Sequence, residues 1–125
     1  MTTVRDVFDF IRSIPERRRF TGLRLPDTAA VAHAGGRIVG AAYANLDGGH
    51  AVVGVAVLPA YRRRGIAFAL ADRLLKRLRG RADFAVWRVD ADNLPSINLA
   101  LSLGGEVVSR GRQWYIKLEI GSRKP

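Results

Sequence analysis

The residues best suited to chemistry form one short turn, Arg62-Arg63-Arg64-Gly65-Ile66-Ala67. Where a helix begins, its first backbone N–H groups lack partners within the helix, and the helix dipole adds partial positive charge. Gly65 and Ala67 leave room for an anion to approach the backbone, and the three arginines raise the positive potential around it. The turn therefore predicts a phosphate site, and it suits a pyrophosphate better than a single carboxylate.

The segments on either side of this turn have the patterns that such a site requires. Residues 50–58 are apolar at nearly every position, which is typical of a strand in the middle of a sheet covered on both faces. Gly54 interrupts the pattern and indicates a bulge or a close approach of backbone. After the turn, residues 66–79 repeat apolar side chains at helical spacing, and Gly80 ends the helix. The turn is thus expected between a central strand and a helix.

The rest of the chain predicts an α/β domain in the order helix, three strands, helix, strand, helix, two strands. An amphipathic helix is expected at residues 4–14, with Thr2 or Thr3 as its cap. Two hairpins follow, one with a two-residue turn at Gly35-Gly36 and one with a slightly longer loop at Asp47-Gly48. The later elements are a strand at 84–89, a helix at 95–103 and strands at 106–109 and 113–120.

The size and composition are those of one globular domain, which we expect to span residues 1–125, with 48% hydrophobic and 26% charged residues. The chain has no cysteine and only two histidines, so neither disulfides nor a metal site are expected. No apolar run approaches the roughly 18 residues that cross a bilayer. The N-terminus carries Asp6 and Asp9 where a signal peptide would need a basic and then an apolar run. These features predict a cytoplasmic protein without a membrane partner.

The formal net charge of +10 indicates an anionic partner, whether a phosphate ligand, a nucleic acid or an acidic protein. Arginine dominates this charge, and its planar fork suits bidentate phosphate contacts. A basic nucleic-acid-binding module is therefore one alternative, although no established binding motif accompanies it and a solvated helix face would explain the same residues. It would use Arg17 to Arg19, the arginine turn, and the run Arg73, Lys76, Arg77, Arg79 and Arg81.

Two segments resemble motifs of the GNAT N-acetyltransferase superfamily. The first, Val53-Gly54-Val55-Ala56-Val57-Leu58-Pro59-Ala60-Tyr61-Arg62-Arg63-Arg64-Gly65-Ile66-Ala67, is similar to the family's coenzyme-A-binding motif. The second, Val89-Asp90-Ala91-Asp92-Asn93-Leu94-Pro95-Ser96-Ile97 with Leu103-Gly104-Gly105, resembles its second motif. The resemblance covers residues 29–120 and implies a GNAT-type α/β (α+β) fold. In this fold helices flank a mixed, mostly antiparallel central sheet, whose first strand is here short or missing.

The resemblance also implies a cofactor, acetyl-CoA or a related acyl-CoA, and the residues that bind it. In the family, backbone groups of the splayed central strand bind the pantetheine arm, a role that falls here on Val55, Ala56 and Val57. The turn amides bind the pyrophosphate, a role that falls on Arg62 to Ala67. Asn93 and Ser96 match positions near the reactive end of the cofactor, and a helix cap or turn is the other explanation for Asn93.

Several family positions hold unusual residues in this chain. Many members place a tyrosine general acid where this chain has Ala100, and some place a glutamate base where it has Arg88. The usual aromatic residue after the last glycine is replaced by Gly105. The resemblance therefore leaves the catalytic residues unknown.

Other residues are candidates for a base that acts through water, namely His50 and Asp47 at the second hairpin and Asp90 or Asp92 after the later strand. A role in a surface turn competes with catalysis at His50 and Asp92. Tyr43 and Ser102 rank below them.

Two functions follow from the resemblance. The first is an acetyl-CoA-dependent N-acyltransferase that acetylates a primary amine on a small molecule or a protein, whose identity the sequence does not give. The second is a catalytically silent, acyl-CoA-binding regulatory domain, which the residues at the acid and base positions favour. The missing first strand predicts an open sheet edge, which either stays free or pairs in a homodimer.

Overall fold

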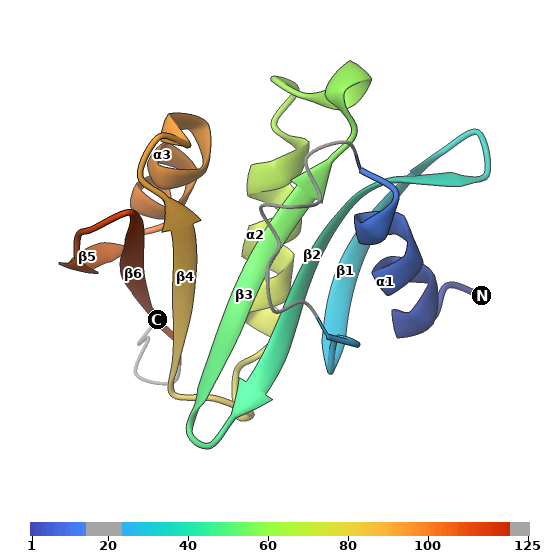
Figure 1. The fold of residues 1–125 in the computed structure, drawn as a ribbon. Coiled ribbons are helices and arrows are strands. Elements are labelled where there is room, and N and C mark those ends of the chain that lie inside the picture. The colour runs from blue at the N-terminus through green and yellow to red at the C-terminus, as the bar shows by residue number, and fades with distance from the viewer. Residues whose placement is uncertain (15–23, 121–125) are drawn as a thin grey trace.

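The protein forms a six-stranded sheet flanked by helices in a computed structural model that describes residues 1–14 and 24–120 (Figure 1). The strand order is β1-β2-β3-β4-β6-β5, and β3 and β4 are the parallel pair among otherwise antiparallel neighbours of the described sheet. The elements are α1 (Val4–Arg12), β1 (Thr28–Ala34), β2 (Arg37–Asp47), β3 (His50–Val57), the 3₁₀ turn η2 (Pro59–Tyr61), α2 (Ile66–Arg77), β4 (Phe84–Asp90), α3 (Leu94–Ser102), β5 (Glu106–Ser109) and β6 (Gln113–Glu119).

The order and type of the predicted elements are confirmed, including the mostly antiparallel sheet. Within the described residues no strand precedes α1, so β1 forms one edge of the sheet. None of the helices built from these residues has the length and apolar character needed to cross a bilayer.

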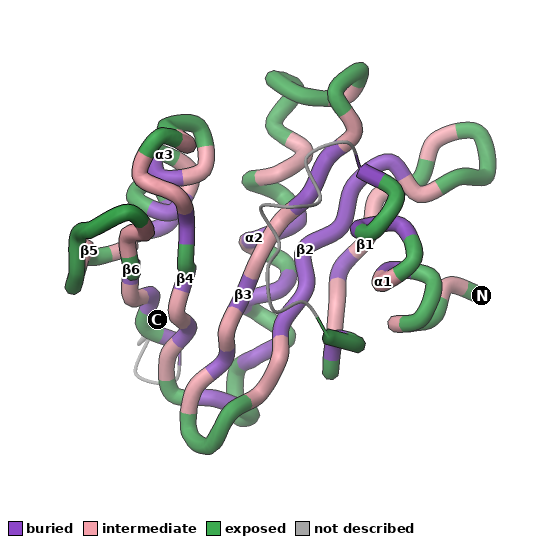
Figure 2. The backbone as a smooth tube through the Cα atoms, in the orientation of Figure 1, coloured by how far each residue is buried: buried purple, intermediate pink, exposed green. Residues whose placement is uncertain are grey.

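Helices cover both faces of the sheet, and the side chains of β2 alternate between the two faces. Its alternate residues Ala42 and Ala44 pack in the core beneath α2 and α3, whereas Ala41 and Tyr43 pack in a second core beneath α1. Residues 39–44 are consequently buried without interruption (Figure 2). Small side chains along β2 let both layers approach the sheet closely, which explains the alanine-rich pattern.

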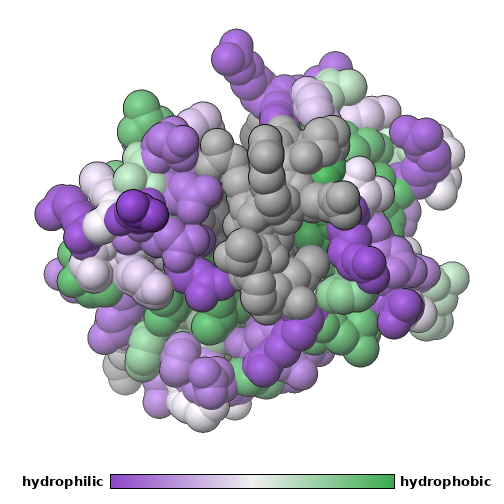
Figure 3. Space-filling view, in the orientation of Figure 1, coloured by the Kyte–Doolittle hydropathy of each residue, from purple (hydrophilic) through white to green (hydrophobic). Residues whose placement is uncertain are grey.

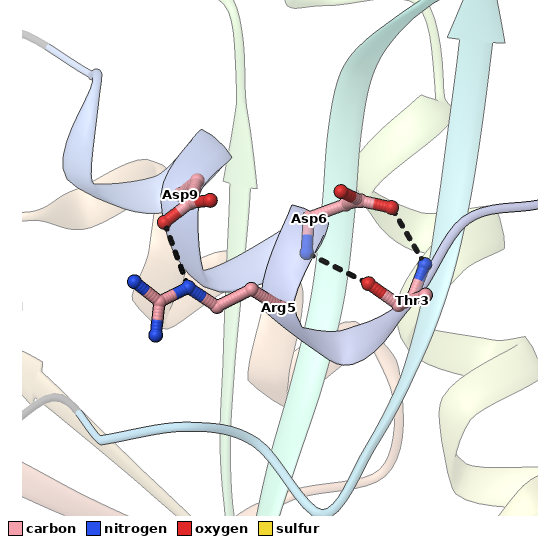
Figure 4. Close-up of polar contacts among 4 residues, drawn as sticks. All are labelled: Thr3, Arg5, Asp6 and Asp9. Carbon is pink, nitrogen blue, oxygen red and sulfur yellow. Dashed lines mark hydrogen bonds and ion pairs between the residues drawn. The ribbon is translucent and has the colours of Figure 1, made fainter.

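Helix α1 begins at a capping box formed by Thr3 and Asp6 (Figure 4). The Thr3 side-chain oxygen accepts a hydrogen bond from the Asp6 amide at 3.2 Å, and the Asp6 carboxylate accepts one from the Thr3 amide at 2.8 Å. These bonds satisfy N–H groups that lack helical partners, and they lower the pKa of Asp6. Of the two predicted caps, Thr3 is therefore the one used, while the Thr2 hydroxyl bonds the His33 ring at 2.9 Å.

The two hairpins turn on glycines with positive φ. Gly35 and Gly36 have φ of 57° and 76°, as expected for the first turn. The second turn is tighter than predicted, because Asp47 still pairs with His50 and only Gly48 and Gly49 lie between the strands. A two-residue turn becomes accessible there because Gly48 adopts a φ of 65°.

Candidate functional site

The central feature of the sheet is the separation of its two parallel strands. Pairing between β3 and β4 runs from His50 opposite Phe84 to Val53 opposite Trp87 and then stops. Strand β3 continues to Val57 and β4 to Asp90, so residues 54–57 and 88–90 diverge toward the end of the sheet that carries η2 and α3 (Figure 1). Among the described residues, this divergence leaves that stretch of β3 without a neighbouring strand on the β4 side.

Alternation along β3 decides which of its backbone groups face this separation. The Leu58 amide donates to the Val39 carbonyl at 2.9 Å, so Leu58 and, two residues earlier, Ala56 turn their backbone groups toward β2. Val55 and Val57 therefore turn theirs toward β4. Of the three residues predicted to bind a pantetheine arm, Val55 and Val57 turn backbone groups toward the separation, although the Val57 carbonyl already accepts a hydrogen bond from Arg62 Nε. Ala56 instead packs its side chain in the core beneath α1.

The arginine turn connects the end of β3 to α2 in an exposed, strained conformation. Gly65 is the N-cap of α2 with a φ of 76°, and no side chain caps the helix. Arg63 also adopts a left-handed conformation, with a φ of 63°, which is uncommon for a residue other than glycine. Residues 62–65 are all exposed, so α2 begins at the surface directly after three consecutive arginines.

Two of the arginines make contacts near the turn, one with the backbone and one with an aromatic ring. The Arg62 Nε donates to the Val57 carbonyl at 2.9 Å, and the Arg64 guanidinium lies 5.4 Å from the centre of the Tyr61 ring. A Cβ atom on Gly65 would meet nothing within 4 Å, so its φ rather than crowding is what favours glycine. The turn therefore has both the positive charge and the open space that a phosphate needs.

Gly40 on β2 sets how closely α2 approaches the sheet, and the sequence analysis did not single it out. A Cβ atom there would lie 3.1 Å from Leu70 Cδ1, 3.3 Å from Val57 Cγ2 and 3.4 Å from Ile66 Cγ2. Glycine thus lets the first two turns of α2 sit against β2 and β3. A glycine inside a strand pattern was the available signal, since such residues mark close packing.

The β4 side of the separation carries the predicted residues Asn93 and Ser96. Asn93 is the N-cap of α3, and its side chain accepts a hydrogen bond from the Ser96 amide at 3.4 Å. The Ser96 hydroxyl accepts a hydrogen bond from the Trp87 indole at 2.9 Å. Because Trp87 is the last residue of β4 that pairs with β3, these contacts fix the start of α3 where the strands diverge. A cofactor contact from either side chain stays a prediction.

Tyr43 and Arg88 lie on the opposite face of the sheet from α2 and α3. Arg88 is exposed and alternates with the buried residues Trp87 and Val89, whose side chains pack in the other core. Tyr43 is only 8% exposed. Burial raises the pKa of the Tyr43 phenol, and the positive charge of Arg88 opposes this rise. The Arg88 guanidinium on β4 therefore affects the pKa of the Tyr43 phenol on β2, although β3 lies between these two strands.

The profile of the Acetyltransferase (GNAT) family matches residues 4–104. The chain belongs to this family. No curated protein sequence matches the chain significantly.

Solved GNAT structures share the fold at low sequence identity. The ribosomal-protein-S18-alanine N-acetyltransferase of Escherichia coli is 21% identical with a TM-score of 0.74, covering 99% of this chain and 93% of that one. The ribosomal-protein-alanine N-acetyltransferase of Brucella melitensis is 19% identical with a TM-score of 0.66, covering 93% and 91%. The Salmonella typhimurium protein yncA, solved with its cofactor acetyl-CoA, is 24% identical with a TM-score of 0.66. The match to yncA covers 76% of this chain and 65% of the length of yncA.

The GNAT acid position is closed in this chain. Ala100 is fully buried in the core between α3 and the sheet, and the amide of Gly105 donates to its carbonyl at 3.0 Å. A Cβ atom on Gly105 would lie 2.6 Å from Ile116 Cγ2 and 2.7 Å from the Ala100 oxygen. The positions at which many family members have a tyrosine and an aromatic residue are therefore occupied here by Ala100 and Gly105, which pack tightly against each other.

The candidate bases lie at different ends of the sheet. His50 is the first residue of β3 and stacks on Phe84 at 5.3 Å, at the end of the paired region opposite to the separation. Asp47 pairs with it there. Asp90 ends β4 and accepts a hydrogen bond from Gln113 Nε2 at 3.2 Å, and Asp92 follows in the turn before α3. Only the last two are thus brought near the diverging strands.

The basic run on α2 is partly engaged in contacts within the protein. Lys76 pairs with Asp72 at 2.9 Å, and Arg77 Nη1 donates to the Ala29 carbonyl. On the face shown in Figure 3, hydrophilic side chains of the described residues spread around the periphery without gathering into one patch. Arg17 to Arg19 fall outside the described residues.

Proposed function

We propose that residues 1–125 form a single domain that transfers an acetyl group from acetyl-CoA, or a related acyl-CoA, to a primary amine. The observation that carries this proposal is the exposed, uncapped start of α2 directly after the unpaired edge of β3, in a chain of the GNAT family. Acetyl-CoA is a long cofactor with phosphates near its middle and a thioester at one end. The phosphates suit the charged arginine turn, and the arm that carries the thioester suits the adjoining edge of β3.

The residues around the strand separation fit the cofactor in three parts. The amides and guanidinium groups of Arg62 to Ala67 hold the pyrophosphate. Val55, Ala56 and Val57 hold the pantetheine arm, with hydrogen bonds from the backbone groups of Val55 and Val57 that face the separation. Asn93 and Ser96 lie on the β4 side, toward the reactive end. When bound, acetyl-CoA supplies a thioester whose acetyl carbon is open to attack by an amine.

The chain's own contribution to rate is chiefly positional. The rigid edge of β3 and the capped start of α3 hold two reactants between diverging strands, and such alignment supplies about 7–11 kcal/mol in well-oriented reactions. The amine has to reach this place in its neutral form, since an ammonium has no free electron pair. A small-molecule amine and a protein amine both satisfy these requirements.

A catalytically silent domain is the second candidate, because Ala100 is buried and Arg88 occupies the base position. Steady-state turnover separates the two functions. The thiol released from acetyl-CoA would be followed with a panel of small amines, amino acids and peptides with free N-termini. Binding of acetyl-CoA without thiol release from any member of the panel would favour the silent domain.

A homodimer formed at the exposed edge of β1 and a cytoplasmic location also stay predictions. Light scattering on the purified protein tests the first of these. A monomer at high micromolar concentration would contradict pairing through β1.

Calorimetric titration with acetyl-CoA tests the cofactor site, and α2 provides a matched pair of variants. Gly65 and Gly80 flank this helix with φ of 76° and 80°, and both have open space around their Cα atoms. Gly65→Glu and Gly80→Glu thus introduce the same charge and similar backbone strain at opposite ends of α2. We expect micromolar binding by the wild type and by Gly80→Glu, and a loss of at least about 100-fold in Gly65→Glu. Equal affinities in the two variants, or no binding by the wild type, would overturn the site.

A further inference from the structure

The ring of Tyr43 lies across the backbone of Gly54. The two residues pair directly between β2 and β3. A Cβ atom on Gly54 would lie 2.5 Å from the Tyr43 hydroxyl oxygen and 2.6 Å from Cζ, so the phenol occupies the place of a side chain. The register between the strands is continuous here, so the predicted bulge at Gly54 is wrong. The predicted close approach at Gly54 is present, and the group that approaches is the side chain of Tyr43. Glycine at position 54 is what allows a tyrosine of β2 to extend over β3.

This contact puts the phenol at the start of the strand separation. Gly54 is the first residue of β3 beyond the pairing with β4, which ends at Val53. Arg88 is the first residue of β4 beyond the same pairing, and its charge acts on the Tyr43 phenol. A hydroxyl from β2 and a guanidinium from β4 therefore flank the point where the strands diverge.

The surroundings of Tyr43 act on its proton in two opposite directions. Its described neighbours in the core beneath α1 are apolar, including Phe10, Ala41 and Ala56. This burial raises the pKa of the phenol and makes it a weaker acid. Arg88 acts in the opposite sense and stabilises the negative charge that remains once the proton has left. The usual acid position, Ala100, has no group that could do this.

We propose that Tyr43 is the proton donor of the acyl transfer, with Arg88 stabilising its conjugate base; this rests on the proposed function. The amine nitrogen forms a bond to the acetyl carbon while the bond from that carbon to sulfur breaks. The departing sulfur takes the proton of the Tyr43 hydroxyl, and the nitrogen releases a proton that restores the phenol. One proton thus passes to sulfur and one leaves nitrogen, and no further reactant is consumed.

Kinetics of Tyr43→Phe test the proposal, with Tyr115→Phe as the matched control. Tyr115 lies on β6 directly opposite Arg88 and is 38% exposed, so its variant removes a second hydroxyl near the same guanidinium. We expect kcat to fall by about 10²- to 10⁴-fold in Tyr43→Phe and to stay within about twofold in Tyr115→Phe. The Kd for acetyl-CoA should change little in either, since a proton donor acts on the departing group. A kcat in Tyr43→Phe equal to that of the control would overturn the proposal.

A binding measurement on the unaltered protein gives a second, independent test. The chain has three tyrosines, so ¹³Cζ-labelled tyrosine gives three resonances; Tyr61→Phe and Tyr115→Phe assign two of them and leave the third to Tyr43. Coenzyme A should shift the Tyr43 resonance, and desulfo-coenzyme A, which lacks the sulfur, should shift it much less. Equal shifts with the two ligands would show that the Tyr43 hydroxyl does not contact the sulfur, and the proposal would fail even if Tyr43→Phe did not fold.

The outcomes for the two proposals are distinguishable. A wild type that binds no acetyl-CoA, or that releases no thiol with any amine, overturns the acyltransferase function and the role of Tyr43 with it. A wild type that turns over, combined with a Tyr43→Phe variant that turns over equally well, overturns only the role of Tyr43. Arg88→Gln adds a check, because it should raise the pKa of the Tyr43 phenol in the ¹³C titration and lower kcat less than Tyr43→Phe does.

Discussion

Gly105 is hydrogen-bonded to Ala100 at a point where a Cβ atom would not fit. The Gly105 amide donates to the Ala100 carbonyl at 3.0 Å, and the Cβ position of Gly105 is only 2.7 Å from the same oxygen. Contacts below 3.0 Å at a Cβ atom force the surrounding atoms to move, and here one neighbour is backbone. The end of α3 is thus packed against β6 so tightly that only glycine fits between them.

Gly105→Ala should therefore destabilise the fold by about 1–3 kcal/mol, as overpacking in a core does. Gly111→Ala is the control, because its Cβ atom would have its nearest neighbour at 3.7 Å, an ordinary contact. That variant should be within about 1 kcal/mol of the wild type. Urea denaturation followed by circular dichroism measures both. A Gly105→Ala variant as stable as Gly111→Ala would mean that α3 can shift away from β6.

Ala100→Tyr restores the residue type that many GNAT members use as an acid, yet we expect it to lose stability and gain no activity. Ala100 is fully buried, and its surroundings include Ile97, Leu103 and Ile116. A phenol has no space there unless α3 moves, so the penalty should be at least that of ordinary overpacking, about 1–3 kcal/mol. Thermal melting and kcat at a temperature where the variant is folded measure the two effects. A folded variant with raised kcat would show that the position opens toward the site.

The capping box of α1 should make the protein sensitive to acid. Hydrogen bonds to the Thr3 amide lower the pKa of Asp6, so its contribution to stability is present above the unfolded pKa of about 3.9 and is lost as pH falls through the folded value. Asp6→Asn should therefore remove part of the loss of stability that the wild type shows below about pH 4. Asp9→Asn is the control, since Asp9 pairs with Arg5 at the exposed surface of the same helix at 3.4 Å. Melting temperatures from pH 2.5 to pH 7 compare the variants, and parallel curves for Asp6→Asn and the wild type would contradict the prediction.

The sequence predicted those features that depend on neighbouring residues. Gly35-Gly36 predicted a tight turn because positive φ at both positions is accessible to glycine, and the structure has it. The helical spacing of apolar residues predicted the helices, and apolar runs bounded by glycine turns predicted the first strands, because such a pattern is a property of one segment. The arginine turn was found for the same reason, since a strand, a glycine and a helix follow one another directly in the chain.

Features that depend on register between strands could not be found in this way. Tyr43 and Gly54 meet because β2 pairs with β3 in one register, and a shift of one residue would put the ring on the other face. The backbone orientation that separates Val55 and Val57 from Ala56 depends on the same register. Arg63 adopts a left-handed conformation that its residue type does not indicate, because the turn between η2 and α2 imposes it.

The raised pKa of Tyr43 predicts a loss of stability at alkaline pH. In the unfolded chain tyrosine ionises near pH 10, whereas in the folded protein burial holds the pKa above that value. The folded state then retains a proton that the unfolded state releases, so stability is complete below about pH 10 and falls as pH rises from there toward the folded pKa. The largest slope for one such group is about 1.4 kcal/mol per pH unit. Tyr43→Phe should reduce the slope by this amount, and Tyr115→Phe, which removes a partly exposed hydroxyl, is the control. Urea midpoints between pH 9 and pH 11.5 measure the difference, and identical slopes in the two variants would show that the Tyr43 phenol ionises without cost in the folded protein.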